Sequence, residues 1–302
     1  MLSTVALAMG GALVTLPQAQ AEDLPGTRPS SARMSVMAAE TTDGLMVAAN
    51  ERGRISQSSA GVSSDGEVAD LAVLKPEGAR VRSAYLATAT TGFTNRPMTQ
   101  PVRLNGQDVP MTGEIPSGIS SYNYLADVTD LVQPTLDGAS PGVAVVTYQE
   151  PVPWLVDGSI LTVVWEDPNV EIDQSVAVLY GALKTEGDTY RLRLASPIDV
   201  DDPATTLEMA LGISFSYQAS GVQQYSTVDV NGQRLTTASG GEDDGRSYNG
   251  ALITMGGLGD RPENPADPSA RPTGPRSDDE RYDLLPFVDD GDTEITVETR
   301  NP

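Results

Sequence analysis

Residues 227–261 read TVDVNGQRLTTASGGEDDGRSYNGALITMGGLGDR. Val228 and Val230 alternate with polar neighbours and lead into Asn231-Gly232, the dipeptide that best tolerates the positive φ angles of a two-residue hairpin. The residues that follow predict the returning strand of this hairpin. The stretch therefore indicates antiparallel β-structure.

The same pattern extends outward over most of the chain. Asn105-Gly106 predicts a second hairpin of the same design, and short β-type runs separated by turns follow one another from residue 68. The 29 glycines and 22 prolines suit frequent turns. We predict an all-β fold, an antiparallel β-sandwich of jelly-roll type with long loops and at most short helical turns. The best helical candidate is residues 122–132, where Asp127 is expected to cap a single turn.

The first 21 residues are typical of a secretory signal peptide. Leu2–Leu16 is mostly apolar but short for a membrane span, which needs roughly 20 residues. Ala19-Gln20-Ala21 fits the small-x-small pattern of a cleavage site after Ala21. The sequence therefore predicts export, a secreted or cell-surface protein, and no membrane insertion after cleavage.

Two further segments are expected after the signal peptide. Residues 22–64 are predicted to be loop-rich with edge strands near 35–39 and 44–48, because their periodicity is weak. Residues 65–302 are predicted to form the β-sandwich domain, and the ending at Asn301-Pro302 suggests that this domain is truncated.

Charge and composition exclude several functions. The net charge is −23, from 42 acidic and 19 basic residues, which opposes binding to nucleic acid and to anionic membranes. Histidine and cysteine are absent. The chain therefore cannot form a Ser-His-Asp or Cys-His nucleophile, a zinc site of thiolates and imidazoles, or an internal disulfide.

Two acidic loops are the sequence's candidate metal site. Their carboxylates belong to Asp243, Asp244, Asp278, Asp279 and Glu280, and glycines beside the first pair leave its backbone carbonyls free to turn. Calcium takes six to eight oxygen ligands of these kinds, so calcium is the expected cofactor if the loops meet. The alternative is that each loop is a solvated turn whose aspartates bond local amides.

Two resemblances add to this interpretation. The run 127–132 and the Asn-Gly hairpins are similar to parts of jelly-roll carbohydrate-binding modules. A second resemblance rests on residues 228–260, 264–268 and 278–287, with the signature Gly-Gly-x-Asp-Asp-Gly followed by Asp-Asp-Glu-x-Tyr-Asp-Leu. Together with residues 157–168, these resemble a family of secreted bacterial and archaeal surface proteins known as a domain of unknown function, over roughly residues 65–302. That resemblance implies an extracellular β-domain without assigned catalytic residues.

These observations predict a non-enzymatic binding or structural module. Trp154 and Tyr248, in loop contexts, are the residues expected to contact an extracellular glycan or a surface protein. The alternative is a glycoside hydrolase that uses two carboxyl groups, because that mechanism needs no histidine.

Overall fold

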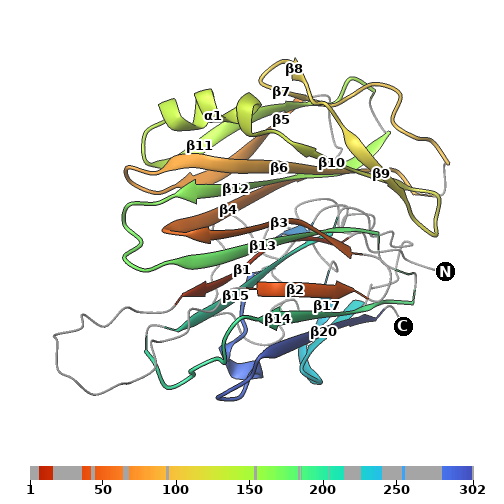
Figure 1. Cartoon of the computed structure of the whole chain (residues 1–302). Coiled ribbons are helices and arrows are strands. Elements are labelled where there is room, and N and C mark those ends of the chain that lie inside the picture. Colours follow the sequence, from red (N-terminus) through yellow and green to blue (C-terminus); the bar gives the residue numbers. More distant parts are fainter. Residues whose placement is uncertain are drawn as a thin grey trace.

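The computed structural model confirms an all-β antiparallel sandwich (Figure 1). It describes residues 7–15, 36–41, 45–63, 68–92, 95–152, 155–182, 184, 186–203, 205–213, 226–239, 254–255 and 281–300. The described part contains one α-helix, α1 (Thr129–Gly138), and a 3-10 turn, η3 (Leu285–Phe287).

The strands form four sheets, here called A to D. Sheet D consists, in spatial order, of β5 (Val68–Lys75), β11 (Gly142–Gln149), β7 (Arg103–Leu104) and β8 (Gln107–Asp108). Sheet C consists of β4 (Ile55–Ser63), β12 (Val156–Glu166), β6 (Arg80–Thr90), β10 (Tyr122–Asp127) and β9 (Thr112–Pro116).

Sheets A and B hold the remaining strands. Sheet A consists of β18 (Thr254–Met255), β15 (Thr206–Ile213), β1 (Leu7–Thr15), β13 (Gln174–Gly181) and β3 (Leu45–Gly53), and β19 (Arg281–Asp283) also pairs with β15. Sheet B consists of β17 (Gln233–Ser239), β16 (Ser226–Val230), β20 (Glu294–Arg300), β14 (Thr189–Leu194) and β2 (Val36–Thr41).

The sheets stack in the order D, C, A, B, from top to bottom in Figure 1. One apolar core lies between sheets D and C, and another lies between sheets A and B. A third apolar contact joins sheets C and A through Ile55, Val164 and Val178. Sheets C and A are therefore covered on both faces, which suits the continuous apolar runs of β12 and β13.

Two local predictions need correction. Residues 55–63, expected to be loop, form β4, which pairs with β12 along its whole length. Residues 122–127, expected to be helical, form β10, because they pair with β6 on one side and β9 on the other. The helix begins only at Thr129, after Asp127 Oδ1 accepts hydrogen bonds from the Thr129 amide (2.9 Å) and hydroxyl (2.6 Å).

Both Asn-Gly hairpins form as predicted. Asn105 and Asn231 have φ of 50° and 48°, and each joins a pair of antiparallel strands. Each asparagine is held in the same way. The amide and Oδ1 of Asn105 bond the backbone of Thr147 on β11, and those of Asn231 bond the backbone of Thr296 on β20.

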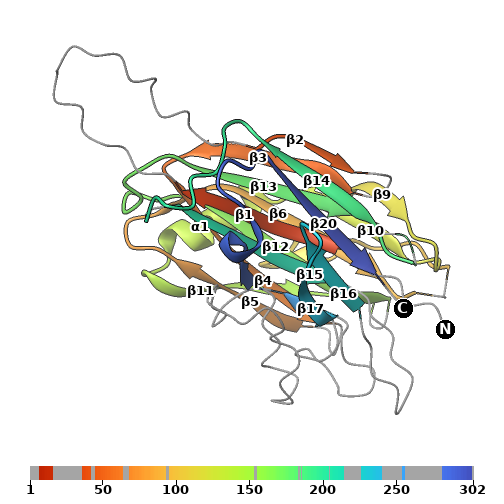
Figure 2. The same ribbon diagram turned by 90° about the horizontal axis from the view of Figure 1, so that it is seen from below.

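The two hairpins are alike because the whole arrangement of strands occurs twice in the chain. The first repeat (residues 55–166) places β5, β11, β7 and β8 side by side in sheet D, and the second (residues 174–300) places β14, β20, β16 and β17 side by side in sheet B. Figure 2, which views the molecule from the side of sheet B, shows the second of these sets. In each repeat a helical segment, α1 or η3, precedes the strand that receives the hairpin.

A buried lysine of β5 caps the C-terminal end of α1. Lys75 is 6% exposed, and its Nζ donates to the carbonyl oxygens of Asp137 (2.7 Å) and Ala139 (2.8 Å). These carbonyls lie at the negative end of the helix dipole, which favours a cation.

We expect Lys75→Met to lower the free energy of unfolding by about 2–3 kcal/mol, because it leaves these carbonyls without a charged donor. Urea unfolding measures this change. Arg96→Met, at an exposed position, is the control and should change stability by less than about 0.5 kcal/mol. Equal effects of the two substitutions would contradict the role assigned to Lys75.

Candidate functional site

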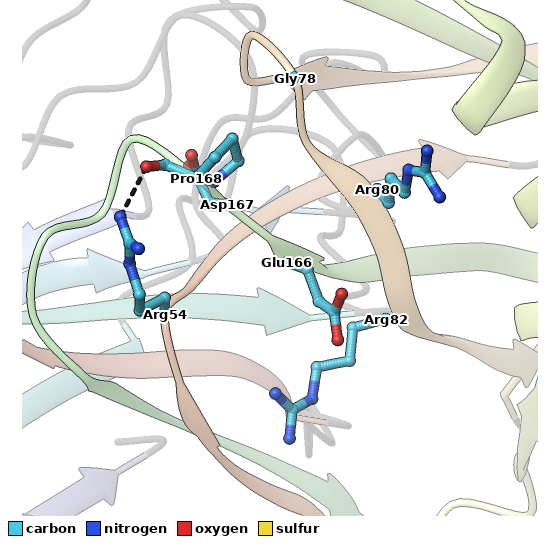
Figure 3. Close-up of a pocket in the computed structure, with 7 residues that line it drawn as sticks. All are labelled: Arg54, Gly78, Arg80, Arg82, Glu166, Asp167 and Pro168. Carbon is cyan, nitrogen blue, oxygen red and sulfur yellow. Dashed lines mark hydrogen bonds between the residues drawn. The ribbon is translucent and has the colours of Figure 1, made fainter.

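The described residues contain an open pocket of about 350 Å³ at the margin between sheets C and A. Charged side chains from three places in the chain line it (Figure 3): the β3–β4 junction, the start of β6 and the end of β12. Its lining residues are Arg54, Gly78, Arg80, Arg82, Glu166, Asp167 and Pro168. Three arginines in one pocket stand out in a chain with 42 acidic and 19 basic residues.

A β-bulge directs Arg82 into the pocket. Val164 of β12 pairs with Ser83, but the next residue, Trp165, pairs with Val81, so Arg82 has no partner in the ladder. A bulge of this kind turns two neighbouring side chains towards one face of the sheet. Arg82 and Ser83 can therefore both reach β3 of sheet A.

Glu51 of β3 receives both of these side chains. Its Oε2 lies 2.7 Å from Arg82 Nε, and its Oε1 accepts a hydrogen bond from the Ser83 hydroxyl. Burial, opposed by the Ser83 hydrogen bond and reinforced by the Glu51 charge, raises the pKa of the neighbouring Tyr85. Sheets C and A are thus joined by a polar cluster beside their apolar contact.

The turn after β12 forms another wall of the pocket. Arg54 Nη2 donates to the carbonyl of Pro168 (2.8 Å), as the dashed line in Figure 3 shows. The buried carboxylate of Asp167 accepts from the Ser56 hydroxyl (2.7 Å) and from the Asn169 amide (2.9 Å). The charges of Arg54 and Asp167 are therefore used to hold the turn in place.

Arg80 and Glu166 remain available to a ligand. They lie directly opposite each other on β6 and β12, and both are exposed. Neither side chain makes a hydrogen bond or an ion pair with any described residue. The pocket thus presents a free guanidinium, which donates in a fork, and a free carboxylate, which only accepts.

This arrangement suits binding better than hydrolysis. A glycosidase needs two carboxyl groups that face each other across the scissile bond. The pocket's carboxyl groups belong to consecutive residues, and that of Asp167 already holds the Ser56 hydroxyl and the Asn169 amide. Among the described residues that line the pocket, the Glu166 carboxyl group alone is left to act.

All the sites predicted from the sequence lie outside the described residues. This holds for the contact residues Trp154 and Tyr248, and for the calcium ligands Asp243, Asp244, Asp278, Asp279 and Glu280. Both sites stay predictions. Within the described ranges, no cluster of three or more acidic side chains is placed to hold a metal ion.

Sequence reasoning did not identify the arginine pocket. The available signal was Arg80 and Arg82 on alternate positions of a strand in a chain poor in basic residues. Alternation shows that two side chains share a face, but it does not show which distant residues meet them there.

Comparison of the chain with protein-family models, with curated proteins and with solved structures finds no match. Among the described residues, no helix is both long and apolar enough to cross a membrane.

Proposed function

We propose that the protein is an exported, non-enzymatic β-domain that binds an acidic glycan at the arginine pocket. One observation carries the proposal: Arg80 and Glu166 lie opposite each other on paired strands, and their exposed side chains have no partner among the described residues. A guanidinium can bind a sugar carboxylate through two parallel hydrogen bonds. The Glu166 carboxylate, on the strand paired with that of Arg80, can accept hydrogen bonds from sugar hydroxyls.

The surroundings of the pair support binding to a preformed site. The Arg54 side chain is held by the carbonyl of Pro168, and the Arg82 side chain is held by Glu51. Both arginines that flank the pair are therefore already fixed by polar partners. A site whose side chains are already ordered loses less conformational entropy when a ligand binds. Export, which we infer from the signal peptide predicted at residues 1–21, would put this pocket outside the cell, where acidic glycans occur.

The alternative function is hydrolysis of a glycan with Glu166 as one of two carboxyl groups. The carboxylate route is the one that a chain without histidine allows. The second carboxyl group would have to come from outside the described residues.

We expect an array of neutral and uronic-acid glycans to show binding of the acidic members only. Arg80→Ala should weaken that binding about tenfold or more, because it removes a charge-assisted contact. The control is Arg103→Ala, which removes an exposed arginine paired with Asp108 on the β7–β8 hairpin. Equal loss of binding in both variants would mean that binding depends on the overall charge of the protein and not on a contact made by Arg80. Release of reducing sugar that Glu166→Gln abolishes would establish the hydrolase instead.

A further inference from the structure

Glu166 lies between two arginines of the pocket. On the β6 side it is directly opposite Arg80, and on the β4 side it is opposite Ile55, the residue that follows Arg54. Neighbouring strands lie about 4.7–4.9 Å apart, so the Cα atoms of both arginines are within roughly 10 Å of the Cα atom of Glu166. Arg82 lines the same pocket, so this carboxylate is set among three guanidinium groups (Figure 3).

The charge of Glu166 is not used to hold the fold together. Its side chain makes no hydrogen bond or ion pair within the part of the chain that the structure describes, although three arginines share its pocket. Arg82 pairs with Glu51 instead, at 2.7 Å, and Arg54 donates to the carbonyl of Pro168. The Glu166 carboxylate therefore acts on whatever enters the pocket.

For a simple anion, the effect of Glu166 is unfavourable. Like charges repel each other, and they do so more strongly near a protein surface than in bulk water. An ionised sulfate or phosphate group presents acceptor oxygens on all sides, so an oxygen that faces the Glu166 carboxylate meets a second acceptor. A pocket for any anion would bind more tightly without Glu166. Its carboxylate is thus a repulsive element of the kind by which a site rejects the wrong ligand.

A uronic acid avoids this repulsion. Its carboxylate has two oxygens, and the fork of a guanidinium such as that of Arg80 can hold both. The hydroxyl groups of the same sugar ring then remain to donate to Glu166, which can only accept. Figure 3 shows the Arg80 and Glu166 side chains diverging from their paired strands. A ligand that reaches both must therefore carry its anion and its donors at different positions, as a uronic acid does.

We propose that Glu166 determines the specificity of the arginine pocket: it selects sugars that carry a carboxylate together with free hydroxyl groups, and it rejects sulfated and phosphorylated sugars. This inference rests on the acidic-glycan binding proposed above and names the class of acidic glycan. Arg80 supplies the attraction for the anion, and Glu166 supplies the choice between anions. A group placed to receive a ligand's hydroxyl discriminates against a ligand that lacks this donor.

Calorimetric titration with two probes of equal length tests the inference. One probe is an oligomer of galacturonic acid, and the other is an oligomer of galactose that carries one sulfate per sugar. We expect the wild type to bind the uronic-acid oligomer at least about tenfold more tightly. Glu166→Gln keeps the shape of the side chain and removes its charge, so it should bind the sulfated oligomer about tenfold more tightly than the wild type does. An unchanged preference in this variant would overturn the inference.

Glu171→Gln is the matched control. It removes the same charge from an exposed residue between β12 and β13 that does not line the pocket. Its affinity for the sulfated oligomer should stay within about twofold of the wild type, because salt screens exposed charges that lie farther from the ligand. An equal gain in both variants would show that overall charge is responsible, and it would overturn the role of Glu166.

The same titrations separate the failure of this inference from the failure of the proposed function. A wild type that binds neither probe would refute glycan binding at the pocket, and the role of Glu166 with it. Equal binding of both probes, weakened by Arg80→Ala, would refute only the selection by Glu166.

Discussion

Replacing Tyr190 with phenylalanine is expected to stabilise the protein, and to stabilise it more as the pH rises. The Tyr190 side chain is 1% exposed, and its hydroxyl has no hydrogen-bond partner among the described residues. A buried hydroxyl without a partner costs about 1–3 kcal/mol, and Tyr190→Phe removes that cost at pH 7.

The pH dependence follows from the pKa of Tyr190, which burial raises well above its ordinary value of 10.0. Above pH 10 the tyrosine of the unfolded chain loses its proton while the folded one keeps it. The wild type therefore loses up to about 1.4 kcal/mol of stability per pH unit through this residue, and phenylalanine loses none. Urea unfolding at pH 7 and pH 11 measures both parts.

Tyr148 offers a matched control. It is also buried, but its hydroxyl oxygen accepts a hydrogen bond from the Ser159 hydroxyl at 3.0 Å. Tyr148→Phe should therefore destabilise the protein at pH 7, by about 1 kcal/mol. If the two substitutions had the same sign at pH 7, the missing partner of Tyr190 would not be the cause.

Gly187→Ala is expected to lower the free energy of unfolding by at least about 4 kcal/mol. Gly187 has a φ of +111°, which favours glycine, and it precedes β14 where the chain passes β20. A methyl group there would lie 2.0 Å from the carbonyl oxygen of Thr299 and 2.7 Å from the Cα of Arg300. These are backbone atoms of β20, which cannot rotate away as a flexible side chain could. The methyl group would therefore force β14 and β20 apart at this end.

Gly232→Ala is the control that distinguishes the strain of a positive φ from a steric clash with neighbouring atoms. Gly232 also has a positive φ, +77°, but a Cβ atom there has nothing within 4 Å. Its substitution should cost only the backbone term, about 1–2 kcal/mol. Thermal or urea unfolding of the two variants gives the comparison, and equal losses would refute a collision at Gly187.

Local sequence was enough for the hairpins and for the fold class. Asn105 and Asn231 adopt positive φ because an Asn-Gly pair tolerates it. This turn preference depends on the two adjacent residues alone, so it can be recognised in the sequence. The class followed from short β-type runs between turns. The boundary of α1 was wrong because residues 122–127 gain more from pairing with β6 and β9 than a local helical pattern can show.

Tertiary structure alone brought the pocket together. Arg80 lies opposite Glu166 only because β6 and β12 pair in one register, and Arg82 turns towards Glu51 only because that register slips at a bulge. These partners lie far apart in the chain, and strand register depends on the packing of whole sheets. The preference for a hairpin turn depends on two adjacent residues. The position of β1 between β13 and β15, in contrast, depends on two strands that lie more than 150 residues away in the sequence.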